Sequence, residues 1–261
     1  MRAIPVIFAL VLACSSKSDN KQQQPPQPNR DTAQPNLALR SAIEKVGDQL
    51  PDLGAFPLPK ELGEDPVFVL EDGVYDHDPT GKPVLGLTDR KLPGSDLVVS
   101  ELLPLFEQRT RGQTVKPFGV DLYVHRDTPF HTFARVLATA REAGFGRFYL
   151  GVKTHQGIRR MPMSLPDEGA APLDVVVSVA TDRLRVWSTS GELGTQDSPA
   201  VDVPASSYGA LASGLDKLVP RDNRAPLTIQ IAPDVPYQSV VLVVAALRPI
   251  AANVTLGLAA Q

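Results

Sequence analysis

Two stretches of the chain follow one pattern: residues 126–153, RDTPFHTFARVLATAREAGFGRFYLGVK, and residues 233–260, PDVPYQSVVLVVAALRPIAANVTLGLAA. Each opens with an Asp-x-Pro-aromatic motif, continues as a helix-length segment with recurring apolar positions, and ends in a strand-like apolar segment. Because the same unit occurs twice in one chain, we expect an internal duplication. The matched residues are Asp127, Pro129, Phe130, Ala138 and Arg141 with Asp234, Pro236, Tyr237, Ala245 and Arg248, and, after a one-residue gap, Leu150 and Gly151 with Leu256 and Gly257.

The segments that precede both motifs also correspond. Residues 67–78, VFVLEDGVYDHD, and residues 173–188, LDVVVSVATDRLRVWS, each have the turn residues and the alternation of a β-hairpin. A helix pattern and then a strand pattern follow each hairpin, and we expect the first of these helices to begin at Ser95. The sequence therefore predicts an α+β fold of two ββαβαβ repeats, at 66–154 and 173–261, each a small mixed sheet with two helices on one face.

The helices of the two repeated stretches have recognisable ends. We expect the helix of the first copy at 129–143, where Gly144 terminates it, and that of the second at 236–248. Residues 239–260 are apolar enough to suggest a membrane helix, but Arg248 and Pro249 lie in their middle. An arginine at the centre of a bilayer is costly, so we interpret this stretch as a buried helix followed by a buried strand.

The N-terminus has the layout of a bacterial secretion signal. Arg2 is followed by a short apolar run, and Val11, Leu12, Ala13 and Cys14 resemble a lipobox. The sequence predicts a lipoprotein signal peptide at 1–13 and a mature chain that begins with Cys14 carrying acyl chains such as palmitate. The alternative is an ordinary signal peptide with a cysteine there by chance.

Three further segments complete the predicted organisation. Residues 14–40 are rich in polar residues and proline, which predicts a disordered tether. Residues 41–65 predict a short helix and a proline-rich connector, with Ser41 and Glu44 in a capping-box pattern. We interpret residues 155–172 as a linker between the repeats.

Bulk composition excludes some classes of function. The 261 residues carry a formal net charge of −3, so the chain has no basic excess for a nucleic-acid surface. Cys14 is the single cysteine, so no intrachain disulfide can form.

No catalytic or metal-binding pattern is present among the candidate residues. Asp127 and Asp234 stand just before helices and are expected to cap them rather than to catalyse. A site formed by histidines around Asp127 is conceivable, but solvated histidines are the favoured interpretation. We expect no metal, no cofactor and no enzymatic activity. The four histidines, His77, His125, His131 and His155, have no metal-ligand spacing.

Two small basic clusters are the remaining candidates for binding. They are Arg109 with Arg111, and Arg159 with Arg160. Such clusters are usually solvated faces, and they could also contact an anionic cell-wall polymer.

The order hairpin, helix, strand, Asp-x-Pro-aromatic motif, helix, glycine and strand resembles the periplasmic domain of the ExbD/TolR family of biopolymer-transport proteins. LYVHRDTPF (122–130) and FYLGV (148–152) carry the resemblance in the first copy, and IQIAPDVPY (229–237) and VTLGL (254–258) carry it in the second. Members of the family pair this domain around a two-fold axis. The resemblance therefore implies that the two repeats are arranged as a pseudo-dimer.

The resemblance also implies a location and a kind of partner. It implies a non-catalytic envelope lipoprotein, held by its lipid anchor at the outer membrane or at the periplasmic face of the inner membrane. Its partner would be peptidoglycan or a Tol/Ton-type envelope protein. The alternatives are a structural envelope lipoprotein without a dedicated ligand and a hydrolase.

One departure from the family pattern bears on mechanism. ExbD and TolR proteins carry a transmembrane helix with an embedded aspartate, whereas the apolar run before Cys14 is short and contains no acidic residue. A membrane-embedded acid is the mark of a proton relay. We therefore expect this chain to bind in the periplasm without harvesting protons.

Replacing Cys14 with serine tests the anchor. The Cys14→Ser substitution should abolish incorporation of a tagged fatty acid, because the diacylglyceryl thioether needs the thiol. Metabolic labelling of both chains measures this directly, and equal labelling of the variant and the wild type would contradict the lipoprotein interpretation.

Overall fold

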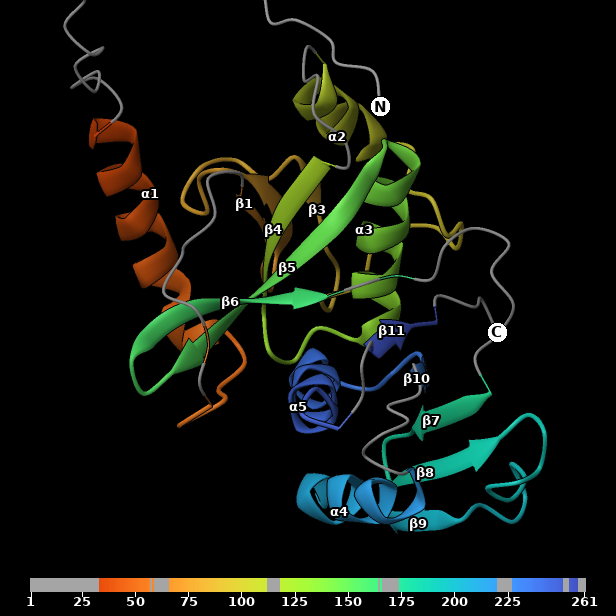
Figure 1. The fold of residues 1–261 in the computed structure, drawn as a ribbon. Helices are drawn as coiled ribbons and strands as arrows, with labels where there is room; N and C mark the ends of the chain where they lie inside the picture. Colours follow the sequence, from red (N-terminus) through yellow and green to blue (C-terminus); the bar gives the residue numbers. More distant parts are fainter. Residues whose placement is uncertain are drawn as a thin grey trace, which may run out of the picture.

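The computed structural model describes residues 33–56, 58, 66–111, 118–163, 165, 174–219, 227–250 and 254–257. The signal peptide, Cys14 and most of the expected tether lie outside the described residues. The fold is α+β, with one six-stranded mixed sheet, one five-stranded mixed sheet and five α-helices in the described ranges (Figure 1). None of these described helices has the length and apolarity needed to cross a membrane.

Sheet 1 is built by the first half of the chain in the order β3-β2-β1-β4-β5-β6. Strands β1, β4 and β5 run parallel to one another, and β2, β3 and β6 are each antiparallel to the preceding neighbour. The strands are β1 (Pro66–Val69), β2 (Gly73–Asp76), β3 (Leu85–Gly86), β4 (Phe118–Val124), β5 (Phe145–Thr154) and β6 (Gly157–Met163).

Sheet 2 is built by the second half in the order β11-β10-β7-β8-β9. Strands β7, β10 and β11 are parallel, and β8 and β9 are antiparallel to their neighbours. From β9 to β11, sheet 2 has the same strand directions and chain order as sheet 1 from β3 to β5. The strands are β7 (Val175–Val179), β8 (Arg183–Ser188), β9 (Val201–Pro204), β10 (Leu227–Ile231) and β11 (Val254–Leu256).

Three strands were not expected from the sequence. β3 and β9 extend the two hairpins, and β6 occupies part of the stretch that we interpreted as a linker at 155–172. β6 pairs along β5 and buries Met161 and Met163, while Arg160 and Pro162 point to the other face. Its two arginines and its proline hide this alternation in the sequence.

Helices α3 (Phe130–Glu142) and α5 (Tyr237–Leu247) lie where the sequence predicts them. Gly144 follows α3 with a φ of 97° and donates its amide to Arg141 O, which confirms its role as the helix terminator. The apolar stretch 239–260 contains the end of α5 and the strand β11, as expected, in its described part.

Two predicted helix starts were wrong. α2 (Leu103–Thr110) begins near Pro104 rather than at Ser95, because proline lacks an amide hydrogen and is accommodated in the first turn of a helix. α1 (Ala33–Val46) begins inside the expected tether. Ser41 therefore lies in the interior of the helix and cannot form the predicted capping box at its start. Leu39, Ile43 and Val46 share one face of α1 against sheet 1, and this packing stabilises the helix beyond the predicted start.

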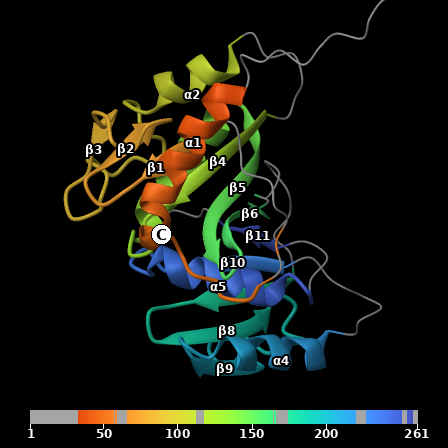
Figure 2. The same ribbon diagram turned by 90° about the vertical axis from the view of Figure 1, so that its left-hand side faces the viewer.

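The two sheets share one hydrophobic core. A single cluster of buried residues includes side chains from both halves, such as Val120 and Phe133 in the first and Ile229 and Val244 in the second. Helices α2 and α3 cover one face of sheet 1, and α4 (Tyr208–Leu218) and α5 cover one face of sheet 2. α5 lies at the boundary between the two sheets in both views (Figures 1 and 2). The halves are therefore joined by packing as well as by the chain.

One buried arginine fixes the loop that leads to α2. Arg135 of α3 is 2% exposed, and its guanidinium donates to the carbonyl oxygens of Leu92, Pro93, Gly94 and Asp96 at 2.6–3.1 Å. Several hydrogen bonds to the charged group offset the cost of its burial.

Helix α1 covers the other face of sheet 1, opposite α3 (Figure 1). Beneath it lies a row of three paired aromatic residues, Tyr75, Phe68 and Tyr123. The equivalent row of sheet 2, read from the same pairing, is Arg185, Ser178 and Gln230. The row is apolar where a helix covers it, and within the described ranges this third layer is present on the first half and not on the second.

Gly151 should be required by the packing of Tyr123. A Cβ atom at Gly151 would overlap the Tyr123 ring, whereas one at the matched Gly257 would lie 3.3 Å from Ile229 O. We expect Gly151→Ala to destabilise the protein by about 1–3 kcal/mol, as overpacking does, and Gly257→Ala to cost less. Urea unfolding of the two variants measures the difference, and equal transition midpoints would contradict this account.

Candidate functional site

The two copies of the Asp-x-Pro-aromatic motif lie against each other. Pro129 and Pro236 are the N-cap residues of α3 and α5, with φ and ψ of −60° and 142° in the first and −62° and 142° in the second. The two prolines form an isolated antiparallel bridge. The two matched prolines thus have the same backbone conformation and contact each other between the halves.

Four backbone hydrogen bonds cross this junction in two matched pairs. The Phe130 amide donates to Val235 O, and the matched Tyr237 amide donates to Thr128 O, both at 2.8 Å. The His131 amide donates to Pro233 O at 2.9 Å, and the matched Gln238 amide donates to Arg126 O at 2.8 Å. Each helix opening is therefore bonded to the loop that precedes the other helix.

This arrangement corrects the expected role of the two aspartates. The first amides of a helix have no partner within the helix, and we expected Asp127 and Asp234 to accept their hydrogen bonds. Neither helix has a side-chain cap, and both aspartates are exposed. Backbone carbonyl groups from the opposite half take the place of the carboxylates.

Aromatic side chains fill the junction behind these bonds. The rings of Phe133 and Tyr237 lie with their centroids 4.7 Å apart, and Phe130 packs beside Phe133 at 6.3 Å. Thr128 and Tyr237 are fully buried, and their hydroxyl groups find no hydrogen-bond partner among the described residues. Burial raises the pKa of Tyr237 well above its ordinary value. The described residues of the motif therefore form a packed contact instead of an open groove.

A connector segment fastens this junction to sheet 1. The Gln238 side chain accepts a hydrogen bond from the Asp52 amide at 2.9 Å and donates one to Asp52 O at 3.1 Å. The residues on both sides of Asp52 also bond to Lys153 of β5. Pro51 O accepts a hydrogen bond from the Lys153 amide, and the Leu53 amide donates to Lys153 O. The first turn of α5 is thereby connected to the chain that follows α1.

His125 directly follows β4, the strand that leads to the first motif. The Asp127 amide donates to His125 Nδ1 at 3.1 Å, which requires this nitrogen to be unprotonated. Burial, assisted by nearby Arg90, lowers the pKa of the His125 imidazole. The histidine is a structural acceptor in its neutral form.

The other histidines lie apart from His125 or face solvent. His131 is exposed on the first turn of α3, and His155 donates its amide to Gly54 O. His77 bonds to Asp76, which also pairs with the buried Arg109. Across the described ranges, no three His, Cys, Asp or Glu side chains gather where they could hold a metal ion.

Within each of the two basic clusters, the two arginines have different surroundings. Arg109 turns inward and also donates to Pro66 O, whereas Arg111 is exposed at the end of α2. Arg160 lies 4.4 Å over the Tyr149 ring and pairs with Asp121 at 3.3 Å. Arg159, the other member of this second cluster, lines a hollow.

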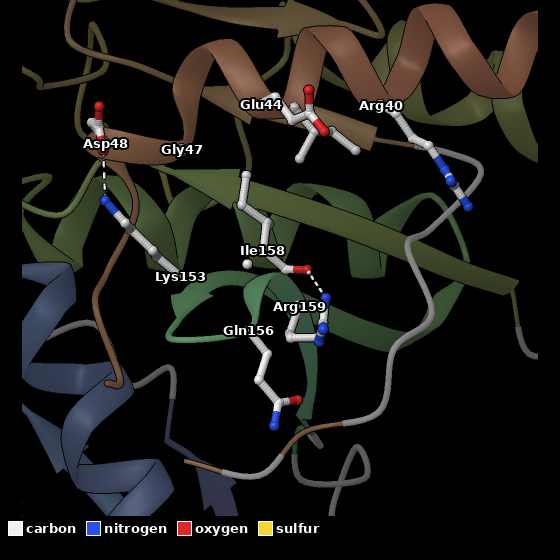
Figure 3. A pocket seen from close by; sticks show the side chains of 10 residues that line it. Arg40, Glu44, Gly47, Asp48, Lys153, Gln156, Ile158 and Arg159 are labelled. Carbon is white, nitrogen blue, oxygen red and sulfur yellow. Dashed lines mark hydrogen bonds and ion pairs between the residues drawn. The ribbon is translucent and has the colours of Figure 1, made fainter. Parts of the chain in front are cut away.

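That hollow is a groove of about 550 Å³ between α1 and the β5–β6 hairpin (Figure 3). An ion pair of Lys153 with Asp48, at 2.6 Å, stands at one end, Arg40 stands at the other, and Arg159 lies between them. The groove is narrow near Gly47, where an added Cβ atom would lie 3.0 Å from Ile158. It is lined by Arg40, Ile43, Glu44, Gly47, Asp48, Lys153, Gln156, Gly157, Ile158 and Arg159.

Among these groove residues, the sequence analysis named only Arg159 as a candidate for binding. Arg40 was assigned to the tether and Gln156 to the linker, and no spacing connects them with Lys153. They meet because α1 packs on sheet 1 and the chain returns through β6.

Comparison with known proteins adds no family to this geometry. The chain matches no family model, and searches of curated proteins and of solved structures also give no match.

Replacing His125 with asparagine should reduce the dependence of stability on pH. A histidine whose pKa is lowered by folding favours the folded state when neutral, so stability is lost as the pH falls below about 6.5. Partial desolvation of the largely exposed His131, assisted by Arg135, lowers the pKa of that imidazole too, so His125→Asn should remove a part of this loss and leave the part due to His131. Asparagine places Oδ1 where His125 Nδ1 accepts the Asp127 amide.

Urea unfolding midpoints between pH 5 and pH 8 measure this effect. A variant whose midpoint falls as steeply as that of the wild type would show that His125 does not contribute.

Proposed function

We propose that this protein is a non-catalytic envelope lipoprotein whose two halves are ExbD/TolR-like modules joined as a covalent pseudo-dimer. It would bind peptidoglycan or a Tol/Ton-type envelope protein from a lipid anchor at Cys14. The observation that supports the proposal most is the matched set of four backbone hydrogen bonds between residues 126–131 and 233–238.

These bonds have the form expected of a two-fold contact. In an isologous interface, residue i of one unit contacts residue j of the other, and the reverse contact also occurs. The Phe130 amide with Val235 O and the Tyr237 amide with Thr128 O satisfy this relation, as does the bridge between Pro129 and Pro236. The common strand order of the two sheets supports the same conclusion.

Joining two modules in one chain removes the need for association and allows each to change separately. The linked modules meet at a high effective concentration, so the contact does not depend on the amount of protein present. In this chain the first half has acquired α1 and β6, while the matched outer row of the second half is polar. We propose that these differences specialise the first half for binding.

Several charged groups in the described core have structural partners, which favours a binding role over catalysis. Arg135 bonds to four loop carbonyls, Arg109 pairs with Asp76, and Asp121 pairs with Arg160. No observation favours a hydrolase. A structural lipoprotein without a ligand is the alternative that a binding experiment must separate.

Sedimentation with isolated peptidoglycan tests the proposal. The Cys14→Ser chain, with a protease site inserted within 166–173, is incubated with isolated sacculi before and after cleavage. We expect the intact chain to pellet with the sacculi, or to cross-link to a Tol/Ton protein in cells. We also expect the two fragments to stay together after cleavage, because they share one core.

The two parts of the proposal fail separately. Absence of both sacculus binding and cross-linking would contradict the binding role and leave the structural alternative. Fragments that elute as separate folded monomers would contradict the pseudo-dimer.

A further inference from the structure

The groove between α1 and the β5–β6 hairpin presents charged groups that the fold does not use. Asp48 and Lys153 pair with each other at one end, so their charges offset each other. Arg40 and Glu44 have no ion-pair or hydrogen-bond partner among the described residues, and the only such partner of the Arg159 guanidinium there is Ile158 O at 2.9 Å. Two guanidinium groups and one carboxylate therefore remain in the groove.

We propose that this groove binds a short peptide through a carboxylate, which lies between Arg40 and Arg159 in the half of the groove away from Asp48. An apolar side chain of the peptide lies against Ile43 and Ile158. The site goes beyond the proposed function, because it requires neither the pseudo-dimer nor a cell-wall partner.

The charges in this half of the groove favour an anion, because the guanidinium groups of Arg40 and Arg159 outnumber the carboxylate of Glu44. Figure 3 draws Arg40 at the end away from Asp48 and Arg159 nearer the middle, below Ile158, so a carboxylate between them would be reached from two sides. Guanidinium groups bind carboxylates through paired hydrogen bonds. Arg159 Nε is buried without a hydrogen-bond partner among the described residues. A buried donor of this kind is costly unless a ligand or water accepts from it.

The rest of the groove favours a peptide over a simple anion. Its volume of about 550 Å³ falls in the usual range for small-ligand sites, and it exceeds what one carboxylate fills. Ile43 and Ile158 supply an apolar wall. The Gln156 side chain carries both a donor and an acceptor without a partner in the described ranges, and a peptide group offers the complementary pair.

A pair of matched dipeptides tests the site on the full-length Cys14→Ser protein. Acetyl-Leu-Ala with a free carboxylate is titrated against acetyl-Leu-Ala amide, with binding followed by calorimetry and by amide chemical shifts. We expect the carboxylate form to bind at least about tenfold more tightly than the amide, because the charge-assisted bonds are lost in the amide. Equal binding of the two forms, or no binding of either at millimolar concentration, would overturn the proposal.

Charge-neutral variants identify the residues. Arg40→Gln and Arg159→Gln should each weaken binding of the carboxylate form about tenfold, while Arg111→Gln, at an exposed arginine on α2, should leave it unchanged. Loss with Arg111→Gln as large as with the groove variants would overturn the proposal, since it would indicate attraction by the overall charge. Unchanged binding in Arg40→Gln and Arg159→Gln would overturn it as well.

Sacculi then identify the source of the peptide and keep this proposal separate from the preceding one. If the Arg40→Gln, Arg159→Gln double variant loses both the dipeptide and the sacculi, the carboxylate belongs to cell-wall peptide, which supports the site. If it loses the dipeptide and still pellets with sacculi, a free or protein-borne peptide is the ligand, and the site is again supported. Retention of the dipeptide by the double variant overturns the site whatever the sacculi do.

Discussion

The structure depends on how the first amides of α3 and α5 find acceptors. A buried amide without a partner costs about 1–3 kcal/mol, and proline at the N-cap leaves the following amides to be satisfied from elsewhere. Each helix takes its acceptors from the loop before the other helix, so neither opening is complete alone. This mutual requirement fixes the position of the two helices, and the aromatic contact of Phe133 with Tyr237 then closes the core around it.

The rest of the arrangement follows from that junction. The first turn of α5 holds Asp52 through Gln238, and the connector around Asp52 runs beside β5. The connector begins just after α1. The position of α1 is therefore set both by its packing on sheet 1 and by the hydrogen bonds that hold Asp52 to α5 and β5. The groove lies between α1 and the β5–β6 hairpin, which approach each other at Gly47 and Ile158 and are joined by the ion pair of Asp48 with Lys153.

Sequence patterns were informative where one residue type decides the local structure. Gly144 ends α3, the hairpin turns lie where expected, and the repeated motif opens two helices. Sequence patterns were misleading where a residue far away in the chain determines the local structure. Nothing near Asp127 indicates that a carbonyl at residue 235 will replace it as the helix acceptor, and the start of α1 depends on an aromatic row that lies more than twenty residues along the chain. β6 was hidden because Arg160 and Pro162 face outward between the buried methionines. The groove residues come from α1 and from a hairpin late in the first half, so no local pattern could assemble them.

The placement of α1 has a mechanical consequence. A pull on the chain at the start of α1 first reaches sheet 1 through Leu39, Ile43 and Val46, which lie along one side of the helix. Force directed away from the sheet peels these contacts one at a time, whereas force along the helix axis must shear all of them together. Beyond Leu50 the same force reaches the hydrogen bonds around Asp52, which divide it between β5 and α5. The direction of a load therefore decides whether it lifts one helix or is shared by both halves.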